Sequence, residues 1–240
     1  MTNEDKFKKV VAEVRDFLKP LGFKKTGTRF YRKTENIFAI VEFQKNKWND
    51  EASLGFTLNL GIASSTLIKL LDGISYFKVP KVPTSADCQE RYRIGSFSET
   101  TRDIWWTITD RIDESQVVEE ILTLLQEAVP YISEVENDTE FCDFLIEKES
   151  KAEEPYLPRC RAILTLLTHL ERGAEAREAR KELLEKFPKK NTQIELNKWD
   201  LSTNQHFTNT FVDERSYCNC EKYYKILSNY RDFLKKIGIF

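Results

Sequence analysis

The sequence has few residues of the kinds that carry out catalysis. Its 240 residues include only two histidines, His169 and His206, and both lie in the second half of the chain. No glycine-rich phosphate loop, HExxH pair or GxSxG turn occurs. Nucleophilic catalysis needs a base that a third group holds beside the nucleophile, and the sequence gives no sign of such a triad. The sequence therefore leaves open whether the protein is an enzyme, and it favours a protein that is not one.

Cysteine is also scarce, and its spacing argues against a metal site. The five cysteines are scattered along the chain, as Cys88, Cys142, Cys160, Cys218 and Cys220. Only the last two lie close together, and one intervening residue is not the CxxC spacing of a zinc knuckle. We expect no metal and no cofactor, with structural zinc as the less favoured alternative. In the absence of an export signal, the thiols are expected to be reduced.

Long hydrophobic runs are missing. The N-terminal stretch MTNEDKFKKV is polar, so we expect no signal peptide. The longest apolar stretch, near residues 162–167, falls far short of the roughly 20 residues that span a bilayer. We therefore expect a cytoplasmic protein that does not bind membranes.

Neither sign of charge dominates. Residues 1–110 hold 18 basic and 14 acidic residues, and the remainder holds 19 and 25, so the two parts carry about +4 and −6. Domains dedicated to nucleic-acid binding are usually far more basic. Nucleic acid is therefore a less favoured partner than protein.

What the sequence does contain is a change of hydrophobic period early in the chain. Apolar residues recur every three or four positions from Phe7 to Leu21, which predicts a helix that Asn3 caps and that ends near Lys19, before Pro20. Alternation of apolar and polar residues then predicts strands, in the ranges 28–33, 37–45, 54–62 and 91–97, while 104–108 is either a fifth strand or the start of the next helix. The pattern predicts an α+β fold with an antiparallel sheet of four or five strands and helices on one face.

The second half of the chain is helical and acidic in character. Helices are predicted over the ranges 65–71, 115–129, 139–151, 153–172, 174–187 and 219–237, with Pro130 ending the second of them. The pair around Gly173 is typical of a helical hairpin. We predict a sheet domain over residues 1–135 and an all-helical C-terminal region over residues 136–240.

The face of the predicted sheet that is not apolar carries amide, guanidinium and indole groups. The candidates are Glu42 and Gln44 on the second strand, Thr57 and Asn59 on the third, Arg91 or Arg93 on the fourth, and Trp105 or Trp106 at the rim. Gly55 and Gly61 on the same face permit close approach to the backbone. Such side chains bind and stack without changing their ionisation. Cross-strand pairing on a solvated face is the simpler interpretation, and a ligand site is the alternative.

Several short motifs recur in the order of a known family. They are Leu18-Lys-Pro-Leu-Gly-Phe-Lys-Lys25, Phe30-Tyr-Arg32, Val41-Glu-Phe-Gln-Lys45, Thr57-Leu-Asn-Leu-Gly61, Arg91-Tyr-Arg93 and Trp105-Trp106. Over roughly the first 135 residues the chain resembles a bacterial family catalogued as domain of unknown function 4304. The resemblance implies an α+β domain of bacterial cytoplasmic type and supplies no reaction. It singles out Gln44, Asn59, Arg93 and Trp106 as positions of interest.

These patterns favour a non-enzymatic interaction module that binds a partner protein through the polar sheet face or the helical hairpin, and an immunity role is one concrete form. The alternative is an enzyme or a protein that handles a nucleotide or phosphate ligand, with Gln44, Asn59 and Arg93 around an anionic group. The candidate binding residues are Glu42, Gln44, Asn59, Arg93 and Trp106. A deep pocket where they converge would favour a small anionic ligand, and a flat, open face would argue against it.

Overall fold

The computed structural model describes residues 2–72, 80–152 and 156–170. They fall into two compact units, the first containing residues 2–65 and 80–137 and the second containing residues 66–72, 138–152 and 156–170. The predicted helices at 174–187 and 219–237, the hairpin around Gly173, His206 and the Cys218–Cys220 pair lie outside the described residues. The domain boundary near residue 135 stays a prediction.

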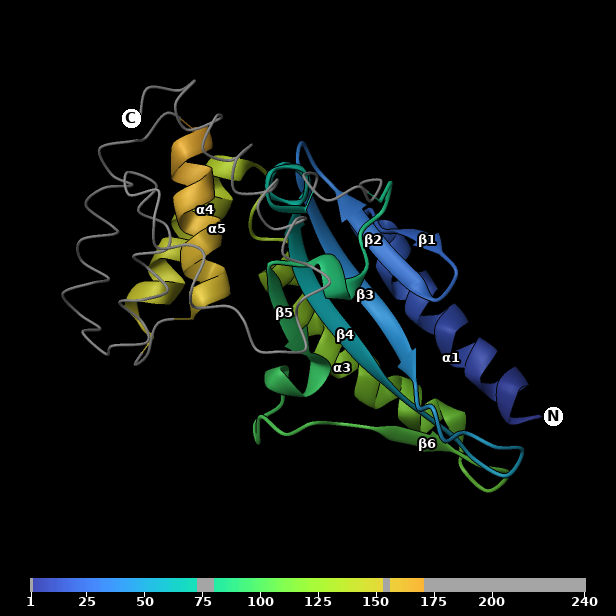
Figure 1. Ribbon diagram of the computed structural model, residues 1–240. Helices are drawn as coiled ribbons and strands as arrows, with labels where there is room; N and C mark the ends of the chain where they lie inside the picture. Colours follow the sequence, from blue (N-terminus) through green and yellow to red (C-terminus); the bar gives the residue numbers. More distant parts are fainter. Residues whose placement is uncertain (1, 73–79, 153–155, 171–240) are drawn as a thin grey trace, which may run out of the picture. The chain divides into compact units, whose positions relative to one another are not determined.

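The first unit is built on an antiparallel sheet, so the predicted α+β class is confirmed (Figure 1). Its strands are β1 (Lys24–Thr26), β2 (Arg29–Lys33), β3 (Ile37–Lys45), β4 (Leu54–Ser64), β5 (Glu90–Arg93) and β6 (Trp106–Ile108). They follow the order β1-β2-β3-β4-β5, and β6 pairs with β4 beyond the end of β5. The described sheet therefore has six strands, one more than predicted, because the short β1 shows no alternation of apolar and polar residues.

The strand predicted over 91–97 is correct only as far as Arg93. From Ile94 to Phe97 the chain forms a 3-10 helix, η4. A Cβ atom at Gly95 would lie 1.7 Å from the carbonyl oxygen of Arg102, so the returning chain packs directly on this glycine. The close approach of two backbones is possible only where no side chain intervenes.

The first helix, α1 (Asn3–Leu18), is capped by Thr2 and not by Asn3 as predicted. Thr2 Oγ1 accepts the Asp5 amide at 3.1 Å, and Asp5 Oδ2 accepts the Thr2 amide at 3.3 Å, which forms a reciprocal capping box. The Asn3 side chain is buried and donates to the Glu51 carbonyl. The 3-10 turn η1 (Lys19–Leu21) and a left-handed Gly22 then end the helix.

Helix α3 (Glu114–Ile132) runs past Pro130, where we predicted that it would end. Pro130 is exposed and lies in the last turn, so the one helical hydrogen bond that it removes is lost at the solvent-facing end. The helical hydrogen-bond pattern continues after Pro130, because the Ser133 amide donates to the carbonyl oxygens of Val129 and Pro130.

Helices α1 and α3 pack against the same face of the sheet, which we call the core face (Figure 1). Aromatic rings join the layers, because Phe7 of α1 makes edge contacts with Phe43 and Phe56, and Phe56 also packs against Trp106. Other buried residues of this face include Phe30, Val41, Leu58, Leu60, Ile62 and Ile108. Alternation along β3 and β4 therefore predicted the core correctly.

Two polar side chains of the core face, the buried Lys6 and the half-buried Tyr92, are held by hydrogen bonds. Lys6 donates from Nζ to the carbonyl oxygens of Thr109, Asp110 and Ile112 at 2.8–3.1 Å, which ties α1 to the loop before α3. The Tyr92 hydroxyl donates to Glu90 at 3.0 Å, and burial beside that carboxylate raises the pKa of Tyr92.

The second unit contains α4 (Asp138–Ser150) and α5 (Leu157–His169), close to the helices predicted at 139–151 and 153–172. The short helix predicted at 65–71 is also present, as α2 (Ser65–Leu67) followed by the π-helix η2 (Ile68–Asp72). Arg159 and Glu149 form a partly buried ion pair at 2.9 Å that joins α5 to α4. Among the described helices, none is long and apolar enough to cross a membrane.

Candidate functional site

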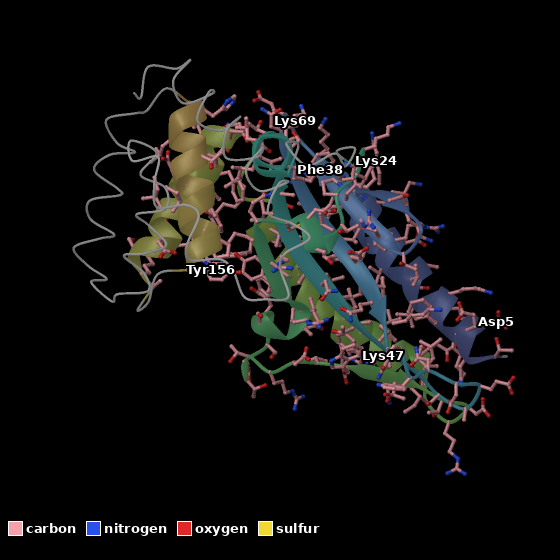
Figure 2. All side chains as sticks on the ribbon, viewed as in Figure 1. Asp5, Lys24, Phe38, Lys47, Lys69 and Tyr156 are labelled. Atoms are coloured by element: carbon pink, nitrogen blue, oxygen red, sulfur yellow. The ribbon has the colours of Figure 1, made fainter. Side chains whose placement is uncertain are left out.

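The face of the sheet opposite the core face, which we call the second face, changes character along the strands. Between β3 and β4 its residue pairs are Phe38–Ala63, Ile40–Gly61, Glu42–Asn59 and Gln44–Thr57. Figure 2 marks the two ends of this face, with Phe38 near the start of β3 and Lys47 just beyond its end. The second face is therefore apolar at one end and polar at the other.

Neighbouring parts of the chain occupy the space beside the two glycines of the second face, Gly55 and Gly61. A Cβ atom at Gly61 would lie 2.6 Å from Cys88 Sγ, and one at Gly55 would touch Asn46 and Asn49. The close approach that we predicted at these glycines is therefore made by neighbouring loops. Burial, together with nearby acidic charge, raises the pKa of the Cys88 thiol, which favours its protonated, unreactive form.

Residues 80–89, which contain the 3-10 turn η3 (Ser85–Asp87), cross the middle of the second face; in Figure 1 they pass in front of β3 and β4. Glu42 fixes this segment, because it accepts the Ser85 amide at 2.8 Å and Arg29 Nε at 2.9 Å. Arg29 also donates to the Val82 carbonyl. Burial alone would raise the pKa of Glu42, but the hydrogen bonds from Ser85 and Arg29 outweigh it and lower that pKa.

Gln44, Asn59 and Arg93 meet on the part of the second face that this segment leaves open. Arg93 Nη1 donates to Gln44 Oε1 at 2.9 Å and to Asn59 Oδ1 at 2.7 Å. Asn59 Nδ2 also donates to Gln44 Oε1 at 2.9 Å, which closes the triangle. The pairing of Asn59 with Arg93 across β4 and β5 brings these groups together.

Residues 98–105, which we call the strap, return across the same face beside this triangle. Thr57 Oγ1 donates to the Ile104 carbonyl at 2.7 Å, and this contact buries Thr57, which we expected to face outward. Thr101 has a φ of 44°, a strained value for a β-branched residue, so the turn of the strap is held in an unusual conformation.

The strap adds two side chains to the triangle. Asp103 Oδ1 lies 3.7 Å from Arg93 Nε, and Asp103 Oδ2 accepts Trp105 Nε1 at 2.9 Å. The Arg93 guanidinium also lies 5.5 Å from the centre of the Trp105 ring, within the range of a cation–π contact. We refer to the set Gln44, Asn59, Arg93, Asp103 and Trp105 as the polar cluster.

Two of the five predicted site residues do not join the polar cluster. Trp106 lies on the core face, buried against Phe56, and its Nε1 donates to Glu120. The exposed tryptophan of the pair is Trp105, which we had named as the alternative. Glu42 shares the second face but is bound to Arg29 and Ser85.

The polar cluster contains one residue that sequence reasoning missed. Asp103 belongs to the irregular strap, where no period indicates which side chains meet the sheet, and only its position two residues before Trp105 hinted at a role. The amide, guanidinium and indole groups of the cluster are suited to hydrogen bonding and stacking. In the part of the chain that the structure describes, no group of three or more His, Cys, Asp or Glu side chains gathers to hold a metal ion.

Comparison with known proteins identifies a family. A family model described as Domain of unknown function (DUF4304) matches residues 14–134, which include β1 to β6 and the polar cluster. Searches of the curated proteins and of the solved structures each gave no match.

Proposed function

The chain belongs to the DUF4304 family, and we propose that it is a non-enzymatic binding module that docks a partner protein on the polar cluster. The observation that carries this proposal is the fixed, exposed arginine at the centre of the cluster. The side chain of Arg93 is 38% exposed, yet Gln44 and Asn59 hold its Nη1 at 2.9 and 2.7 Å. A side chain that is already ordered loses little entropy when a partner binds.

The composition of the cluster supports recognition of a protein surface. Arginine and tryptophan are the residues most enriched at the energetic centres of protein interfaces, and Trp105 lies beside Arg93 with 38% of its surface exposed. The hydrogen bond from Thr57 to Ile104 fixes the strap that carries Trp105. Both side chains are therefore presented by a fixed scaffold.

A small anionic ligand is the second candidate, because Gln44, Asn59 and Arg93 do converge, as this alternative requires. Gln44 is exposed, and Asp103 is 55% exposed in its side chain, so the polar groups lie on open surface. Binding sites for small molecules usually enclose most of the ligand. The open position of the cluster supports a protein partner over a small ligand.

Affinity capture with the tagged full-length chain tests the docking proposal. The cluster variants Arg93→Ala, Asn59→Ala and Trp105→Ala are compared with two controls outside the cluster, Arg91→Ala and Trp48→Ala. Trp48 is the stringent control because it is 76% exposed and its loss removes the same residue type. We expect proteins captured from a lysate of the source organism by the wild type and both controls to be lost with the cluster variants.

The captured partner, once purified, is then measured for direct binding. Truncation of a central arginine or tryptophan should weaken the affinity by about tenfold or more. If Arg93→Ala and Asn59→Ala leave every captured partner bound with unchanged affinity, the polar cluster is not the docking site.

A further inference from the structure

The guanidinium of Arg93 uses two of its five N–H donors in the hydrogen bonds of the polar cluster. Both protons of Nη1 are directed to Gln44 Oε1 and Asn59 Oδ1. The Nε and Nη2 groups form the other edge, and Asp103 Oδ1 lies 3.7 Å from Nε, within ion-pair range but too far for a hydrogen bond. No hydrogen bond to this edge occurs among residues 2–72, 80–152 and 156–170. The Nε–Nη2 edge of Arg93 is therefore a bidentate hydrogen-bond donor without a hydrogen-bond acceptor in the described part of the chain.

The amides around Arg93 increase this surplus of donors. Gln44 Oε1 accepts two hydrogen bonds and Asn59 Oδ1 accepts one, so the acceptor atoms of both side chains are directed into the cluster. The amide nitrogen of the exposed Gln44 makes no hydrogen bond within the described part of the chain. A ligand that complements this surface must therefore supply acceptors.

Charge and shape narrow the choice of acceptor. A carboxylate matches the planar edge of an arginine with two parallel hydrogen bonds. A phosphate dianion brings a second negative charge close to Asp103, and like charges at such distances repel. The Trp105 ring, 5.5 Å from the guanidinium, flanks Arg93, and Asp103 is held on Trp105 by its other oxygen. These features favour a single, planar, singly charged group.

We propose that the free edge of Arg93 binds an aspartate or glutamate carboxylate from an acidic segment of the partner protein. Asp103 stands beside this position and competes with the incoming carboxylate. This inference rests on the docking function proposed above, and it adds the chemistry of the partner.

A hexaglutamate peptide is the probe for this site, with hexaglutamine as the neutral peptide of equal length and inorganic phosphate as the second anion. The full-length chain, labelled with ¹⁵N, is titrated at about physiological ionic strength, at which charges beyond roughly 8 Å are screened. We expect hexaglutamate to shift the Arg93 Nε–H and Trp105 Nε1–H resonances in a saturable way. Hexaglutamine and phosphate should leave them in place.

Three variants assign the binding to the edge of Arg93. Arg93→Lys keeps the charge and loses the two-pronged geometry, so hexaglutamate should bind about tenfold more weakly. Asp103→Asn removes the competing charge while it keeps an acceptor for Trp105, so binding should become about threefold tighter. Arg91→Gln removes an equal charge two residues away on the same strand and should change the affinity less than about twofold.

The opposite results overturn the carboxylate site. One such result is that hexaglutamine or phosphate shifts the Arg93 and Trp105 resonances as much as hexaglutamate does, or that hexaglutamate shifts neither. The others are weaker hexaglutamate binding by Asp103→Asn, or a loss of affinity in Arg91→Gln equal to that in Arg93→Lys. Amide spectra of each variant establish that the fold is retained. If hexaglutamate fails while partner capture still depends on Arg93 and Trp105, the carboxylate site is wrong and the docking function stands. If hexaglutamate binds and no captured partner depends on the cluster, the docking function is wrong.

Discussion

The two faces of the sheet in the first unit are buried by different means. Two helices cover the core face, and their contacts with it are aromatic and aliphatic, as with Phe7 against Phe43 and Phe56. Irregular segments cover the polar part of the second face and are held by side-chain hydrogen bonds, such as those that Glu42 and Thr57 make. Burial on the core face is spread over many contacts, while burial on the polar part of the second face depends on a few hydrogen bonds.

This difference explains where the second face stays open. An apolar face must be covered throughout, because burial of apolar surface stabilises the fold by about 25 cal/mol per Å², and an exposed ring loses this contribution. A polar face is satisfied wherever its groups bond to one another, as Gln44, Asn59 and Arg93 do. The second face therefore tolerates an exposed cluster between residues 80–89 and the strap, where a partner has access.

The largest effect is expected from a cavity in the core face. Phe56 is fully buried between Phe7, Phe43 and Trp106. Phe56→Ala should lower the free energy of unfolding by about 3–5 kcal/mol. Urea denaturation of the full-length chain, followed by tryptophan fluorescence, measures this loss. Trp48→Ala removes an exposed ring and should change the stability by less than about 0.5 kcal/mol. Equal losses for the two variants would contradict the assignment of the core.

A smaller effect is expected where the backbone of the strap touches η4. The added methyl group in Gly95→Ala would lie 1.7 Å from the Arg102 carbonyl oxygen, so the strap must move. We expect a loss of about 1–3 kcal/mol in the free energy of unfolding, together with a red shift of the summed tryptophan fluorescence as the strap lifts and exposes Trp105 further. Ser96→Ala, at the exposed neighbouring position, is the control. Unchanged stability and fluorescence in Gly95→Ala would mean that the strap is not packed on η4.

The difference between regular strands and irregular segments also decides how much of the structure could be predicted from the sequence. The core face could be predicted because a strict alternation over residues 54–62 places its side chains on one side. Gln44, Asn59 and Arg93 could be expected together, because strands that pair in sequence bring alternate residues side by side. The matching family model covers the same region. The regular strands therefore made both the fold and the centre of the candidate site predictable from the sequence.

The irregular segments could not be predicted in this way. A shift of one residue reverses the faces of a strand, and β6 is only three residues long, so sequence reasoning preferred Trp106 where Trp105 is the exposed residue. Asp103 and Ser85 reach the second face from segments without any period. Their positions depend on contacts distant in the sequence, such as that between Gly95 and Arg102, which only the folded chain defines.

The smallest effect is expected from Glu42, which joins residues 80–89 to the sheet through Arg29 and Ser85. Glu42→Gln keeps the shape and removes the charge, so we expect a loss of about 1–2 kcal/mol at neutral pH. Because folding lowers the pKa of Glu42, its stabilisation is present above its ordinary value of 4.5 and is lost as the pH falls through the lower, folded value. The difference in stability between wild type and Glu42→Gln should therefore shrink below pH 4.5. Urea denaturation at a series of pH values measures this difference, with the exposed Glu35→Gln as control. A difference that stays constant with pH would show that the charge of Glu42 does not hold the segment, and the second face would then depend on shape as the core face does.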